Sequence, residues 1–134
     1  MPFSDYQEKR TLDNVFGAIA ATPAAIYYIS LHTAAPGQTG INEVAAASAY
    51  ARVAVTNNAT NFPNSTSSPA TKSNGAAVSF PTPTGSWGTA TYFGIWDAAS
   101  TGNYVGGAAL TTPQAIGLNN TVAFAVGALT FTLT

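Results

Sequence analysis

The stretch at residues 89–110 constrains the fold of this chain more than any other part of its sequence. Alternate residues of an extended strand point to opposite faces, so Phe93 and Ile95 fall on one face and Trp96 on the other. A strand with bulky side chains on both faces is typical of the centre of a sheet. The Asp, Ser, Gly and Asn residues after Trp96 favour a turn, and an apolar run then resumes up to Leu110. The stretch therefore predicts a central β-hairpin.

The rest of the chain after Ala20 shows short apolar or alternating runs separated by turn residues, without helical periodicity. Further strands are predicted at residues 25–33, 50–55, 76–80, 114–118, 121–126 and 129–134. Thr111-Thr112-Pro113 is interpreted as a connection, and residues 56–74 as a long polar loop. The predicted fold is mainly β: an antiparallel β-sandwich, jelly-roll-like, with one N-terminal α-helix.

The N-terminal segment carries the signals of a helix. Ser4 can cap it and Gln7 can return the bond as in a capping box, so a helix is expected from Asp5 to about Ala20. An apolar stripe at helical spacing is expected to pack on one end or edge of the sandwich; it consists of Leu12, Val15, Phe16 and Ile19. The Thr22-Pro23 break then divides the chain into a helical segment, 1–22, and a β-sandwich domain, 23–134.

Charge is scarce in this chain, and that bears on its partners. Only 7% of the residues are charged and the formal net charge is −1, so the surface is covered by small neutral polar groups. Such a surface favours burial against other protein copies, and the absence of a basic cluster argues against nucleic acid. The chain has no cysteine. Its N-terminus predicts neither a signal peptide nor a membrane span, which implies a soluble product released in a cytoplasm.

Several stretches carry a resemblance to a known family. They are Ser-Ala-Tyr-Ala-Arg at 48–52, the run Val-Ser-Phe-Pro-Thr-Pro-Thr-Gly-Ser-Trp-Gly-Thr-Ala-Thr-Tyr-Phe-Gly-Ile-Trp-Asp-Ala at 78–98, Ala-Leu-Thr-Thr-Pro at 109–113 and the final Gly-Ala-Leu-Thr-Phe-Thr-Leu-Thr. With them the chain resembles small tailed-bacteriophage virion proteins, commonly labelled tail fibre or minor tail proteins, some proteins of this type being capsid decoration (cement) proteins. The resemblance spans nearly the whole chain.

The resemblance implies a structural protein of the virion, made in the bacterial cytoplasm. The preferred expectation is a capsid decoration protein that binds as a homotrimer across major capsid subunits and stabilises the assembled head. The first alternative is a tail fibre or minor tail component that contacts a tail protein or the host receptor. The second is a carbohydrate-binding module, because aromatic faces at Trp87, Tyr92, Trp96 and Tyr104 could stack on sugars; in strands such residues more often belong to a core or a subunit interface.

The inventory of reactive side chains argues against an enzyme. A single histidine, His32, lies in a predicted strand, where a hydrogen-bonded structural role is favoured over a base or metal ligand. Glu43 and Asp97 are far apart in sequence for a carboxylate pair, and Asp97 is expected to bond turn amides. No cofactor, metal site or catalytic residue is predicted.

The candidate interface residues lie in or next to the N-terminal helix, the long loop and the central hairpin: Phe3, Tyr6, Arg10, Phe62, Trp87 and Tyr104. The charged residues of the N-terminal segment are interpreted either as the solvated face of an amphipathic helix or as part of a docking arm, and the segment is expected to dock as well as to pack. Its apolar Met1-Pro2-Phe3 end, with restricted backbone freedom, suits a groove in a neighbouring protein.

Overall fold

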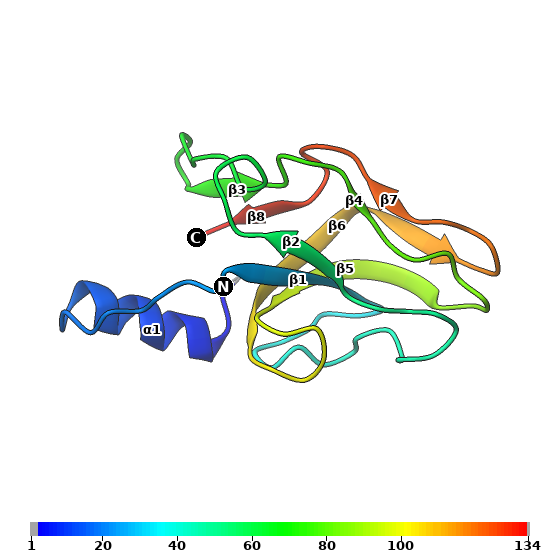
Figure 1. The fold of residues 1–134 in the computed structure, drawn as a ribbon, viewed down its shortest axis with the longest axis horizontal. Helices are drawn as coiled ribbons and strands as arrows, with labels where there is room; N and C mark the ends of the chain where they lie inside the picture. Colours follow the sequence, from blue (N-terminus) through cyan, green and yellow to red (C-terminus); the bar gives the residue numbers. More distant parts are fainter. Residues whose placement is uncertain (1–2, 134) are drawn as a thin grey trace.

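The computed structural model describes residues 3–133, which form one helix followed by eight short strands (Figure 1). In chain order the elements are α1 (Asp5–Val15), β1 (Ile26–His32), β2 (Val53–Thr56), β3 (Thr71–Ser73), β4 (Val78–Ser79), β5 (Gly88–Trp96), β6 (Tyr104–Ile116), β7 (Ala123–Phe124) and β8 (Thr130–Thr132). The predicted class, mainly β with antiparallel sheets and one N-terminal helix, is confirmed.

The principal layer is a four-stranded antiparallel sheet in the order β2-β1-β5-β6. Two separate antiparallel pairs, β3-β8 and β4-β7, form the second layer (Figure 1). The sandwich is not closed into a barrel. A jelly roll would have a continuous sheet as its second layer, whereas here that layer is split into two short ribbons.

Strand β5 is the central strand that the sequence predicts, because β1 and β6 pair with its two edges. Its Phe93 is 2% exposed and points into the core between the layers. Trp96 points to the opposite face and is 8% exposed, because the segment 33–52 folds over that face and places Gly40 against the indole. Both faces of the strand are therefore buried, which explains why bulky side chains occur on both of them.

Strand β6 is longer than predicted and includes the stretch that was expected to be a connection. Its register against β5 jumps, because Tyr92 pairs with Ala109 whereas Ala90 pairs with Gln114. Pro113 lies in this irregular stretch, where a missing N–H interrupts no regular ladder bond. The other differences are small: β7 and β8 are shorter than expected, and β3 interrupts the predicted long loop.

Helix α1 starts as predicted but ends earlier. Ser4 caps it, accepting a bond from the Gln7 backbone N–H at 3.2 Å. The return bond of a capping box is missing, because the Ser4 N–H donates to the Val105 carbonyl oxygen instead. The helix stops at Val15 rather than near Ala20, and Ala18, with φ of 53°, lies in the left-handed region that a helix cannot continue through.

The start of the helix lies against the sandwich, but the predicted packing of its apolar stripe there is wrong. No residue of α1 is buried, and the four side chains of the apolar stripe are exposed: Leu12 57%, Val15 61%, Phe16 81% and Ile19 61%. The core forms without them, from both layers of the sandwich. An amphipathic pattern indicates which side chains must be buried, but it does not indicate whether the same chain or another protein buries them.

A glycine in β6 gives the first testable prediction, since a Cβ on Gly107 would overlap the Phe93 carbonyl oxygen and lie 2.5 Å from Tyr104 Oη. We expect Gly107→Ala to lower the free energy of unfolding by about 1–3 kcal/mol, because the paired β5 backbone must move. Gly117→Ala is the matched control, with no atom within 4 Å of the new Cβ and an expected change of about 1 kcal/mol or less. Urea unfolding of both variants measures the difference, and equal stabilities would contradict the prediction.

Candidate interaction surface

The N-terminal arm, residues 5–24, projects from the sandwich (Figure 1). It consists of α1 and a return segment that is held to the helix by polar contacts. The Arg10 guanidinium donates to the Thr22 carbonyl oxygen at 2.9 Å, and the Ile19 N–H donates to the Asp13 carbonyl oxygen at 3.2 Å. These bonds give the arm a defined shape but bury little of its surface.

The far end of the arm is apolar, and we call its four exposed side chains, Leu12, Val15, Phe16 and Ile19, the arm tip. A free helix of 11 residues is marginally stable in water. Full burial of each such side chain would contribute about 1.5–3 kcal/mol. The arm tip therefore has the composition of a contact surface rather than of a solvated helix face.

The base of the arm is anchored to its own chain. Phe3 forms an isolated antiparallel bridge with Gly106, and Ser4, which is fully buried, donates from its hydroxyl to the Tyr104 carbonyl oxygen. The Phe3 ring lies 5.2 Å from the Phe131 ring, centroid to centroid. Phe3 thus packs against its own sandwich, which contradicts its expected place in a neighbour's groove. Met1 and Pro2, the rest of that expected tip, lie outside the described residues.

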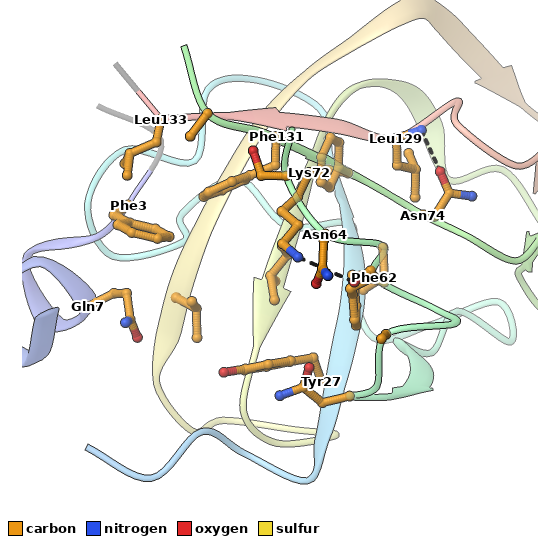
Figure 2. Close-up of a pocket in the computed structure, with 18 of the residues that line it drawn as sticks. Phe3, Gln7, Tyr27, Phe62, Asn64, Lys72, Asn74, Leu129, Phe131 and Leu133 are labelled. Carbon is orange, nitrogen blue, oxygen red and sulfur yellow. Dashed lines mark hydrogen bonds between the residues drawn. The ribbon is translucent and has the colours of Figure 1, made fainter. Parts of the chain in front are cut away.

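A second feature is an open cavity of about 570 Å³ between the four-stranded sheet and the β3-β8 pair, which we call the inter-sheet pocket (Figure 2). Its lining is mainly apolar and aromatic, including Phe3, Tyr27, Ile29, Phe62, Phe93 and Phe131. Asparagine and serine side chains of the loop after β2 line its rim. The volume falls in the range of 300–1,000 Å³ typical of ligand sites.

Lys72 of β3 also lines the pocket (Figure 2). Its ammonium group donates to the carbonyl oxygens of Pro63 at 2.8 Å and Phe62 at 3.3 Å. Within residues 3–133 the salt bridge found is Arg52–Glu43, so Lys72 has no carboxylate partner there. The pocket therefore combines apolar walls with one cation whose charge is not neutralised by a described residue.

The structure separates the six predicted interface residues into three groups. Tyr6 and Arg10 lie on the arm, with the guanidinium carbon 5.3 Å from the tyrosine ring centroid. Phe3 and Phe62 line the inter-sheet pocket. Trp87 and Tyr104 are 6% and 5% exposed and belong to the interior, so they offer little surface to another protein.

Three of the four aromatic residues weighed as a sugar-stacking platform, Trp87, Trp96 and Tyr104, are buried, whereas Tyr92 is half-buried. The Trp87 indole donates to the Ser48 carbonyl oxygen at 2.9 Å, and Trp96 packs at 5.2 Å from Tyr104. Sequence reasoning missed Tyr27, Lys72 and Phe131 as pocket residues. No motif or spacing in the sequence relates these three residues, because they come from β1, β3 and β8 and meet only through tertiary packing.

His32 has the structural role that the sequence predicts. Its ring contacts Ser30 Oγ at 2.8 Å and the Ile41 carbonyl oxygen at 2.7 Å, and both side chains are fully buried. Burial lowers the pKa of His32 below its ordinary value of 6.5, opposed in part by the bond to the Ile41 carbonyl. Although Ser30 and His32 resemble a nucleophile and base, no substrate can reach them at this depth.

The lowered pKa predicts a loss of stability in acid. In the unfolded chain His32 takes up a proton near pH 6.5, whereas in the folded chain it does so only at lower pH. We therefore expect the free energy of unfolding to fall as the pH drops below 6.5, and His32→Gln to remove that part of the slope. Urea unfolding between neutral and mildly acidic pH tests this, and an identical slope in the variant would contradict it.

The two carboxylates weighed for catalysis have structural partners. Glu43 pairs with Arg52 at 2.8 Å, and Asp97 accepts from the Asn103 N–H at 2.7 Å, the turn-bonding role predicted for it. Among residues 3–133 no cluster of three or more His, Cys, Asp or Glu side chains is placed to hold a metal ion. No helix in the described part of the chain is long and apolar enough to cross a membrane.

Comparison with protein families identifies the kind of protein. Residues 2–132 match the family model described as podophage GP4 fiber I protein gp80. The chain belongs to this family. A comparison with curated proteins found no match. The match covers nearly the whole chain, and it confirms the resemblance to small tailed-phage virion proteins with a tail fibre label. The Gp80-family protein is thus a structural protein of the virion.

Proposed function

We propose that this Gp80-family protein is a structural subunit of a podophage tail fibre, joined to the virion through protein contacts rather than acting as an enzyme. The observation that carries the proposal is the arm tip, because four large apolar side chains are 57–81% exposed on a projecting arm. Exposed apolar surface of this kind marks a protein interaction site. The family description supports the fibre as its location.

The architecture suits such a subunit. The sandwich is a rigid body whose surface carries few charges, and the arm extends its apolar tip beyond that body (Figure 1). Association must offset the loss of translational and rotational freedom, and a tip that is already ordered by bonds such as Arg10 to Thr22 loses less entropy on binding.

Capsid decoration by a homotrimer bound to major capsid subunits is the alternative role. The low charge and small size of the domain support it as well, because a small sandwich could add buried area at seams of the head. The family description favours the fibre over the head, and the homotrimer stays a prediction for either location. A receptor glycan remains a third alternative, although Trp87 and Trp96 are buried.

Quantifying and locating the protein on purified virions tests the proposal. We expect labelled antibodies to mark the tail, and quantitative mass spectrometry to find from a few to a few tens of copies per particle. Hundreds of copies with label over the head would establish decoration instead. Absence from purified virions would overturn both roles.

A further inference from the structure

We propose that the arm tip of one copy of this protein inserts into the inter-sheet pocket of a second copy, so that the subunits join head to tail. This inference names the partner of the arm and rests on the proposed structural function. It is carried by three observations on the described residues: matching apolar surfaces, a geometry that prevents the arm from reaching its own pocket, and complementary charges.

The two surfaces match in chemistry. The arm tip presents leucine, valine, phenylalanine and isoleucine side chains, and the pocket presents the half-buried side chains of Tyr27, Phe62, Ile95 and Phe131. The pocket volume of about 570 Å³ leaves room for several of these side chains. Each surface alone exposes apolar groups to water, and joining them removes both from solvent.

The arm cannot fill its own pocket. Gln7 and Phe3, at the base of the arm, line the pocket, and α1 runs away from it (Figures 1 and 2). At a rise of 1.5 Å per residue, Val15 lies about 12 Å along the helix axis from Gln7. Phe3 and Ser4 hold the base to β6 through backbone bonds, so the helix cannot turn back without breaking them. The pocket that a tip can enter is therefore that of another copy.

The charges point to the same partner. On the described sandwich Glu43 pairs with Arg52 and Asp97 bonds to Asn103, which leaves Lys72 at the pocket without a carboxylate. Asp13 lies on the arm beside the tip, is exposed, and forms no salt bridge within residues 3–133. Docking of the tip would bring an Asp13 carboxylate towards Lys72 of a second copy. Opposite charges at such a contact select partner and register.

The consequence is a directional assembly. The tip and the pocket are different surfaces, so each copy has one of each to offer and the contact is heterologous. Contacts of this type generate open chains, or rings where the rotation closes. Both forms are compatible with a repeated subunit of a fibre.

Two complementary variants test the proposal by sedimentation velocity. In the tip variant, Leu12→Ser with Phe16→Ser removes apolar surface that the fold does not bury. In the pocket variant, Ala59→Trp fills the pocket from its exposed rim. We expect the unmodified protein to assemble with rising concentration, each variant alone to stay monomeric, and an equal mixture to form a 1:1 dimer and nothing larger.

Matched controls are Leu118→Ser, another exposed apolar side chain, and Ala99→Trp, an exposed alanine away from the pocket; both should assemble as the unmodified protein does. Charge exchange gives a second readout. Asp13→Lys and Lys72→Glu should each weaken assembly at least severalfold, and the two together in one chain should restore it. Thermal melts test whether each variant is folded. If Ala59→Trp does not fold, Lys72→Glu takes its place as the pocket variant in the mixing experiment.

Three results would overturn the inference. One is a protein that stays monomeric up to about 1 mM, the weak limit of specific association. Another is a folded pocket variant that still self-associates, because arms would then pair with arms. The third is a charge exchange that fails to restore assembly. A protein that is monomeric but located on the tail would refute the inference and leave the proposed function intact. A protein that assembles but is located on the head would support the inference and refute the proposed function.

Discussion

Replacing Phe93 by alanine is expected to lower the free energy of unfolding by about 3–5 kcal/mol. The side chain is 2% exposed on the central strand and packs in the core between the two layers. Its removal loses apolar burial and leaves a space next to the inter-sheet pocket, which the ring also lines. Because the site borders a pocket that is already open, few neighbouring side chains are packed closely enough to move into the new cavity.

The matched control is Phe16→Ala on the arm tip, where the same atoms are removed from a ring that is 81% exposed. We expect its effect on the stability of the monomer to stay within about 0.5 kcal/mol. Urea unfolding at low protein concentration compares the two variants. Similar losses at both positions would show that Phe93 does not hold the core.

Arg52→Met should be nearly as damaging, with a loss of about 3–5 kcal/mol. Arg52 forms a two-pronged pair with Glu43, both bonds at 2.8 Å, and its guanidinium carbon lies 3.8 Å from the Trp96 ring centroid. It also donates to the carbonyl oxygens of Ala98 and Thr101, each at 2.9 Å. Methionine keeps most of the apolar stem, so the loss measures the missing charge and donors.

Two controls isolate the cause. Arg10→Met removes an arginine from the arm, where it donates one exposed bond to Thr22, and should lose no more than about 1 kcal/mol. The double variant Glu43→Gln with Arg52→Met should lose less than Arg52→Met alone, because no unpaired carboxylate then remains at a side chain that is 20% exposed. A double variant that is no more stable than the single would assign the effect to the stacking on Trp96 and the carbonyl bonds.

The same buried network limits the chemistry that this chain can perform. Tyr50 donates to Glu43 at 2.9 Å and accepts from the Leu31 N–H at 3.0 Å, and burial raises its pKa far above the ordinary value. Burial raises the pKa of Tyr104 as well. Charged and titratable groups on this face therefore hold the segment 33–52 against the sheet.

Local sequence determined the parts of this protein that depend on near neighbours. Bulky side chains on both parities of residues 89–96 required burial on both faces of the strand, as is typical of the centre of a sheet. Ser4 marked the start of the helix, and Asp97 closed the following turn through bonds to Asn103. These features follow from backbone geometry and from bonds that span a few residues, so the pattern of residue types is sufficient to predict them.

Only the tertiary structure decided which apolar surfaces the chain covers by itself. The stripe from Leu12 to Ile19 has the same spacing whether it packs on its own sandwich or on another molecule; anchoring of Phe3 and Ser4 to β6 directs it outward. The pocket likewise depends on residues as distant in sequence as Tyr27, Lys72 and Phe131. Such contacts arise from how strands pair and layers stack, and no periodicity within a single segment records them.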